Sequence, residues 1–153
     1  MAVLAVPTML ALAGCTSGTA EAERLAAAFC TAASTRDETA ATAMMTAGLQ
    51  SQIADVRAFD ARFRVRRPGD KPPLGDGLRL TAYPDAVTDC RVTVESPLQV
   101  SLHYIPAGAP TAGWNDRLLL VRTTGGDLRV GEIAFAGDTR VRLRNWLDEA
   151  MTE

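Results

Sequence analysis

The sequence predicts one α+β domain, and three observations carry this prediction. Apolar residues recur at helical spacing as far as Phe63, whereas apolar and polar residues alternate from Thr88 onward. Helical and strand patterns that are segregated in this way are typical of N-terminal helices packed on an antiparallel sheet. A last amphipathic stretch adds a C-terminal helix, and 153 residues suit a single domain with a substantial core.

The opening fourteen residues contain no charged side chain. They are too few to cross a bilayer as a helix, which needs about 20 residues, but their length fits the apolar region of a secretory signal. The run ends in Leu12-Ala13-Gly14-Cys15. This sequence resembles the lipobox of bacterial lipoproteins, in which the cysteine is lipidated and the chain is cut just before it.

That resemblance implies a signal peptide over residues 1–14, a lipidated tether over 15–20 and a folded domain over 21–153. Cys15 would then anchor a periplasmic lipoprotein to the membrane, and Thr16 after it favours the outer membrane if the host has one. No Lys or Arg precedes Cys15, which suggests a start codon upstream of Met1. The alternative is a buried N-terminal helix in which Cys15 is a small apolar residue.

The other two cysteines, Cys30 and Cys90, form an even pair. An exported protein meets an oxidising compartment, where such a pair is interpreted as a disulfide. Closing this loop would stabilise the fold by about 4 kcal/mol. The alternative is two buried free thiols. No His or Cys neighbours them at metal-ligand spacing, so no metal site is predicted.

Three helices are expected in the first half of the chain. Glu21 and Glu23 in its first turn begin an amphipathic helix that breaks at residues 34–36. The capping box Thr35-x-x-Glu38 begins a short second helix, which Gly48 would end. A third amphipathic helix then runs from Leu49 to Phe63.

Strands are expected after residues 64–77, a loop with three prolines and three glycines. A weak strand at 78–83 precedes a hairpin of strands 88–94 and 98–104. The next strand is apolar on both faces at Leu118–Val121, so we expect a central strand covered on both sides. A turn at Gly125-Gly126-Asp127 leads to strand 128–135. Asp138 or Thr139 would cap the final helix, whose inner stripe is Leu143, Trp146, Leu147 and Ala150.

Two segments carry a family resemblance. "AAAFCTAASTRDETAATAMMT" and "GWNDRLLLVRTTGGDLRVGEIAF" resemble the opening helix pair and closing hairpin of the nuclear-transport-factor-two-like superfamily. Ketosteroid isomerase and polyketide-cyclase-like proteins belong to this superfamily. The resemblance covers about residues 20–150. It implies a cone-shaped, cystatin-like fold, in which a curved sheet and its helices enclose a pocket.

A catalytic site in such a cone would need a carboxylate or histidine in an apolar cavity. Asp116 shares strand parity with Trp114 and could project inward, although pairing with an arginine is the interpretation we prefer. Glu132 could also face inward, and we expect it to be paired. His103 is expected to face away from Leu102 and Tyr104.

Aromatic residues supply the candidate binding positions. Tyr83, Tyr104 and Trp114 could border a pocket, or they could be core residues. A run of basic residues is the strongest local charge feature and is expected to be a solvated loop; it consists of Arg62, Arg64, Arg66, Arg67 and Lys71.

The function we favour is a lipid-anchored cell-envelope protein that binds a small ligand or an envelope protein and is not an enzyme. The formal net charge of −2 argues against nucleic acid as a partner, and no nucleotide-binding or metal motif predicts a cofactor. The alternative is a cone-fold isomerase or hydratase that uses Asp116 or Glu132 as its base. That enzyme requires an enclosed pocket with an unpaired, desolvated carboxylate.

Overall fold

The computed structural model describes residues 13–75, 77–136 and 141–152, and the side chains of 13–17 lie outside this description. Within it the α+β class is confirmed, with helices first, an antiparallel sheet next and a helix last. The elements are α1 (Ala13–Ser34), α2 (Glu38–Ala43), α3 (Ala47–Arg66), β1 (Val87–Ser96), β2 (Gln99–Pro106), β3 (Trp114–Arg122), β4 (Leu128–Ala134) and α4 (Leu143–Ala150).

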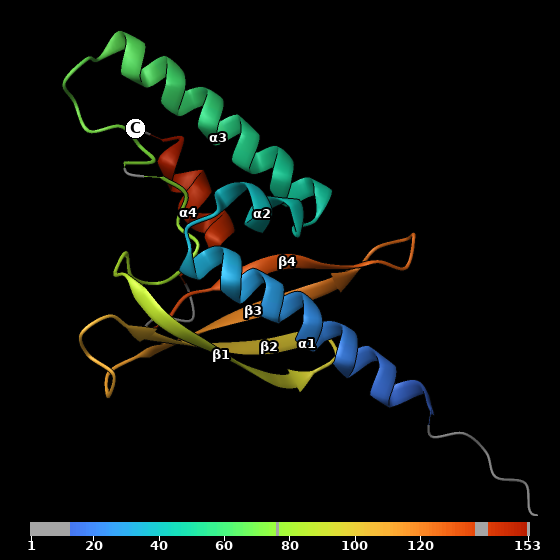
Figure 1. Ribbon diagram of the computed structural model, residues 1–153. Coiled ribbons are helices and arrows are strands. Elements are labelled where there is room, and N and C mark those ends of the chain that lie inside the picture. The colour runs from blue at the N-terminus through green and yellow to red at the C-terminus, as the bar shows by residue number, and fades with distance from the viewer. Residues whose placement is uncertain (1–12, 76, 137–140, 153) are drawn as a thin grey trace, which may run out of the picture.

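The four strands form an antiparallel meander in the order β1-β2-β3-β4. Each strand therefore pairs with its neighbour in sequence, and both predicted hairpins are confirmed. In Figure 1, α1 crosses one side of this sheet, and α3 and α4 lie above the sheet in this view. Helix α4 contacts β4, and α3 contacts α4. The core is made where α1 meets the strands, around Phe29, Leu102 and Leu118, which are fully buried.

The opposite face of the sheet is more open than the sequence suggested. Leu118 and Leu120 are buried, but Leu119 is only half-buried and Val121 is 46% exposed. The prediction that β3 is covered on both sides is therefore wrong. Val121 leans over Gly131 of the neighbouring strand, where an added Cβ would clash with its side chain. A neighbouring glycine thus accommodates this apolar side chain without a covering helix.

The helix boundaries differ from the expected ones at two points. Asp37, not Thr35, caps α2, because its carboxylate accepts the N–H of Ala40 at 2.9 Å. Thr35 instead donates its hydroxyl to the Thr31 carbonyl in the last turn of α1. Gly48 lies inside α3 and does not end α2, since the chain bends at residues 44–46 to pair with the sheet.

That bend covers one edge of the sheet. Thr46 N–H donates to the Val130 carbonyl at 2.9 Å, and Val130 N–H donates to Met44 at 3.0 Å. Met45 therefore forms a parallel bridge with Val130 of β4. This short pairing satisfies backbone groups that an edge strand would otherwise leave to solvent.

The N-terminal segment is helical from Ala13 onward in the described part of the chain. The segment expected as a tether, 15–20, is therefore part of α1. Residues 1–12, most of the expected signal peptide, lie outside the described residues, as do the expected cap residues Asp138 and Thr139. No helix among the described residues has the length and hydropathy of a membrane span.

Candidate functional site

The long connection between α3 and β1, residues 67–86, forms the wall of the candidate site. It contains no strand in its described residues, so the prediction of a strand at 78–83 is wrong. Leu78, Leu80 and Ala82 are nevertheless buried. Figure 1 shows this segment returning from the end of α3 to β1. Side chains accept several of its backbone N–H groups, so these groups do not pair with a neighbouring strand.

Three carboxylates, one from each of α2, α3 and β3, accept N–H groups of this connection at every fourth residue. Asp60 accepts from Leu74 at 2.9 Å, and Glu38 accepts from Leu78 at 2.8 Å. Asp116 accepts from Ala82 at 2.9 Å. Hydrogen bonds to a charged acceptor are stronger than neutral ones, so these contacts replace the missing strand pairing.

Two of these carboxylates are also paired with arginines. The second oxygen of Asp60 accepts from Arg64 Nε at 2.7 Å, and that of Glu38 accepts from Arg57 at 2.8 Å. Arg64 in turn donates to the Gly75 carbonyl. Asp60 and Arg64 have the i,i+4 spacing of a helical ion pair, whereas Glu38 and Arg57 are 19 positions apart, so the sequence gives no signal for that second pair.

Asp116 lies on β3 with its side chain 1% exposed, on the same face as Trp114 and Leu118, as strand parity predicted. No arginine forms an ion pair with Asp116 among the described residues, contrary to expectation. Instead the two oxygens of Asp116 accept backbone N–H groups from Ala82 and from Ala136, the latter at 2.8 Å. Burial raises the pKa of the Asp116 carboxyl, and the two backbone hydrogen bonds partly oppose that rise.

The three aromatic candidates lie next to one another beside Asp116. Tyr104 and Trp114 stack with ring centroids 5.6 Å apart, and Tyr83 sets its edge against Trp114 at 5.3 Å. Tyr104 and Trp114 are buried, whereas Tyr83 is 46% exposed. Burial, and secondarily the charge of Asp116, raises the pKa of Tyr104. Among the described residues, the buried Tyr104 hydroxyl and the indole N–H of Trp114 have no hydrogen-bond partner.

Glu132 is paired, as expected. One of its oxygens accepts the backbone N–H of Arg144 at 3.2 Å, and the other lies 3.8 Å from that residue's Nε. The side chain is buried on β4, and the pair ties β4 to the first turn of α4. Glu132 therefore has a structural partner and is not an unpaired base.

A cleft of about 530 Å³ lies between the connection and the helices. One wall comes from residues 71–75 and 77–85 of the connection, and the other comes from the end of α1, the start of α2 and one residue of α4. Its charged and aromatic lining residues are Arg36, Glu38, Lys71, Arg79, Tyr83, Asp85 and Trp146. Neither Asp116 nor Glu132 lines it.

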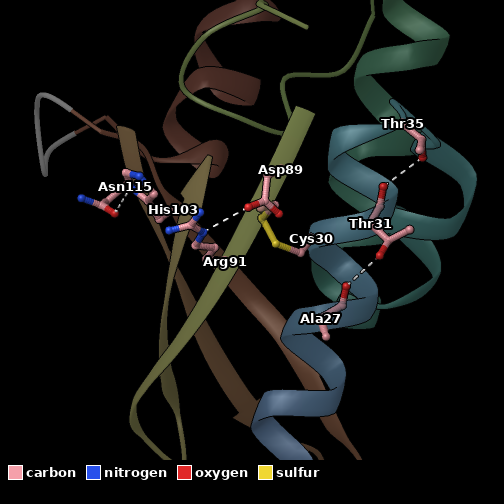
Figure 2. Close-up of a disulfide and its surroundings, with 9 residues drawn as sticks. Ala27, Cys30, Thr31, Thr35, Asp89, Arg91, His103 and Asn115 are labelled. Atoms are coloured by element: carbon pink, nitrogen blue, oxygen red, sulfur yellow. Dashed lines mark hydrogen bonds and ion pairs between the residues drawn. A yellow bond between two sulfur atoms is a disulfide. The ribbon is translucent and has the colours of Figure 1, made fainter. Parts of the chain in front are cut away.

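The disulfide between Cys30 and Cys90 joins α1 to β1, with their Cα atoms 5.9 Å apart. The structure thus bonds the two cysteines that the sequence analysis paired. Figure 2 shows this bond between helix and strand, with Thr31 on the helix beside it. A groove of about 350 Å³ runs over the bond between α1 and β1, lined in part by the hydroxyl-bearing residues Thr31, Ser34 and Thr88.

His103 lies on the far side of β1 from α1, together with Asn115 (Figure 2). Its Nδ1 lies 2.9 Å from the Asn115 side-chain oxygen, and the parity prediction that it points away from Tyr104 is confirmed. Neither cleft nor groove includes it. His103 is therefore a hydrogen-bonded residue of the open sheet face.

The basic run is divided among different roles. Arg64 pairs with Asp60, and the Arg67 guanidinium lies 5.6 Å from the centre of the Phe63 ring. Arg62 and Arg66 are exposed, and Lys71 alone of the five lines the cleft. The sequence analysis missed the other cleft residues, Arg36, Arg79 and Trp146, because they converge from elements that are distant along the chain. No group of three metal-ligating side chains occurs among the described residues.

Removing the Glu38 carboxylate is expected to lower the free energy of unfolding by about 1–2 kcal/mol in Glu38→Ala, because Leu78 N–H loses its acceptor. Glu38→Gln should cost less than about 1 kcal/mol, since its amide oxygen still accepts from Leu78 and only a partly exposed ion pair is lost. Urea unfolding measures both values, and hydrogen exchange at Leu78 reports the contact directly. Glu23→Ala, an exposed acid on α1, is the control; an equal loss there would contradict the role of Glu38.

Together the fold and the site define an α+β domain with a side-chain-held connection and an open polar cleft. Comparison of the chain with protein-family models, curated proteins and solved structures found no match.

Proposed function

We propose that this chain is a lipid-anchored cell-envelope protein that binds a small ligand and is not an enzyme. The observation that carries the binding role is the cleft of about 530 Å³, with Tyr83 and Trp146 among its lining residues. Ligand sites combine an apolar or aromatic lining with a few polar groups. This cleft has both.

The arrangement of the carboxylates argues against the isomerase or hydratase alternative. A general base must be within reach of a substrate proton. Asp116 is desolvated, but both of its oxygens accept backbone N–H groups and it does not line the cleft. Glu132 is paired with Arg144. Neither carboxylate is available to act on a ligand held in the cleft.

The lipobox-like sequence ending at Cys15 supports the envelope location, and the Cys30–Cys90 disulfide is consistent with it. The helical backbone from Cys15 to Ser34 would span roughly 28 Å at the usual rise per residue. Ser34 lines the cleft at the opposite end of α1 from Cys15. An anchor at Cys15 would therefore hold the cleft away from the membrane surface.

The cone shape implied by the superfamily resemblance stays a prediction. It is supported by the helices-then-meander order and by the contacts of α1 with strands β1, β2 and β4. The proposed binding role does not depend on it, because the cleft is formed by the connection and the helices.

Replacing the proposed anchor residue by Cys15→Ser is expected to move the protein from the membrane fraction to the soluble periplasmic fraction, because the serine cannot take the thioether-linked lipid. Fractionation of the native host, with intact mass of the purified protein, measures both location and acylation. Ser17→Ala is the matched control, since it leaves the cysteine in place. Cys15→Ser protein that stays in the membrane fraction would contradict the anchoring role.

Binding at the cleft is tested by NMR on the isotope-labelled domain, with mixtures of neutral, anionic and cationic small molecules. We expect amide shifts confined to the connection and the end of α1, at residues such as Lys71, Tyr83 and Ala33. Shifts that map to the open sheet face around His103, or no shifts with any mixture, would contradict the assignment of the cleft.

A further inference from the structure

We propose that the ligand of the cleft is an organic anion, with an acidic oxygen group on a planar apolar body. Arg36 and Lys71 would bind the anionic group, and Tyr83 and Trp146 would contact the planar body. This inference rests on the proposed function, because it names the chemical class of ligand for the same cleft.

Charge in the cleft is unbalanced in favour of an anion. Among the described lining residues, the cations are Arg36, Lys71 and Arg79, and the acids are Glu38 and Asp85. The charge of Glu38 is matched by Arg57, which does not line the cleft, at 2.8 Å. Three cations therefore face the single remaining carboxylate, Asp85, and this excess favours a negatively charged ligand.

The three cations are not equally available. Arg79 donates to the carbonyls of Thr81 and Ala82, and its guanidinium lies 4.4 Å from the centre of the Phe135 ring. Arg79 therefore contributes charge to the cleft, but two of its five N–H donors are already bound to carbonyl groups. Lys71 makes no ion pair or hydrogen bond within the described residues. Its ammonium group is the most available cation of the cleft.

Arg36 occupies a backbone position that favours glycine. Its φ is 56°, the left-handed region, where it ends α1: its own N–H donates to Ala33 and that of Asp37 donates to Ala32. A residue other than glycine in this conformation costs stability, which suggests that its side chain is needed. One of its terminal nitrogens donates to the Pro84 carbonyl. The remaining N–H groups of the fork can bind a planar anionic group.

Two aromatic side chains supply the apolar contact. Tyr83 is 46% exposed and is held edge-on by the buried ring of Trp114. Trp146, on α4, is half-buried and lines the opposite wall. Aromatic rings held in fixed orientations favour flat ligands, because stacking adds to the energy gained by burial. The cleft volume of about 530 Å³ accommodates such a ligand.

The test compares three probes that share one ring: benzoate, phenyl phosphate and the neutral benzamide. NMR titration of the labelled domain gives each dissociation constant and the residues that shift. We expect both anions to bind at the cleft, with benzoate at least about fivefold tighter than benzamide, and this preference to fall as ionic strength rises. The ratio of benzoate to phenyl phosphate affinity identifies the anionic group.

Substitutions separate the role of charge from that of fold. Lys71→Gln and Arg36→Gly should each weaken anion binding about fivefold to tenfold and leave benzamide unchanged. Glycine suits the left-handed backbone at position 36, so the domain is expected to stay folded. Arg66→Gln removes an exposed nearby cation outside the cleft and is the control.

Equal binding of all three probes at the cleft would overturn the anion preference and leave the proposed binding role intact. If Arg66→Gln weakens anion binding as much as Lys71→Gln does, the assignment of the anion to the cleft cations is likewise overturned, and the proposed binding role stays intact. Cleft shifts with neutral or cationic compounds only, in the mixtures described above, would likewise overturn the inference alone. A cleft that binds neither these probes nor those mixtures would overturn both.

Discussion

Replacing Cys30 and Cys90 together by serine is expected to lower the free energy of unfolding by about 4 kcal/mol, because the unfolded chain gains the freedom of a large loop. The disulfide is the covalent link between α1 and β1, and α1 covers the core residues of the sheet. Urea unfolding of the oxidised protein and the double variant, monitored by tryptophan fluorescence and circular dichroism, measures the difference.

Two controls accompany this result. Cys15→Ser, made in the same domain, tests whether the loss is specific to the paired cysteines. The wild-type protein under reducing conditions should match the double variant. A double variant within about 1 kcal/mol of wild type would mean that the bond does not restrict the unfolded chain as expected.

The Asp116→Ala variant is expected to lose about 2–3 kcal/mol of unfolding free energy. It leaves the buried N–H of Ala82 and the partly buried N–H of Ala136 without their acceptor, and relief of the desolvated charge offsets part of that cost. Hydrogen exchange at Ala82 and Ala136 should rise together. Asp127→Ala, on the exposed turn between β3 and β4, is the control. A loss no larger than that of the control would contradict the structural role.

Asp116→Asn adds a test of pH dependence. Burial raises the pKa of the Asp116 carboxyl in the folded protein, so folding favours its protonated form. Its contribution to stability is fully present below the ordinary carboxyl pKa of about 4, and it is lost as the pH rises through the raised value. Because asparagine does not titrate, wild type should lose stability relative to Asp116→Asn over this window. A difference that is constant with pH would contradict a raised pKa.

Local patterns along the sequence predicted most of the regular structure. Strand alternation identified both hairpins, and strand parity placed Asp116 inward and His103 outward. Helical spacing identified α1 and α3, because the apolar residues on one face of each helix are buried, including Phe29 on α1 and Ile53 on α3. These features depend on neighbours within a few residues, which a sequence displays directly.

The site was less predictable because it depends on contacts between distant segments. The acceptor of Ala82 N–H is 34 positions along the chain, and that of Leu78 N–H is 40 positions back. The alternation at residues 78–83 suggested a strand, but these side-chain acceptors take the place of a neighbouring strand. Glu38 was interpreted as part of a capping box, although its carboxylate reaches the connection instead.

The bridge between Met45 and Val130 has a consequence for folding and aggregation. The meander β1-β2-β3-β4 pairs only neighbours in sequence, so it can form locally, but Val130 on its β4 edge stays unpaired until the chain at residues 44–46 arrives. An open edge can recruit a strand from another molecule. A fragment beginning at Val87 should therefore associate through β4, and the N-terminal helices act as the protection that keeps the intact chain from doing so.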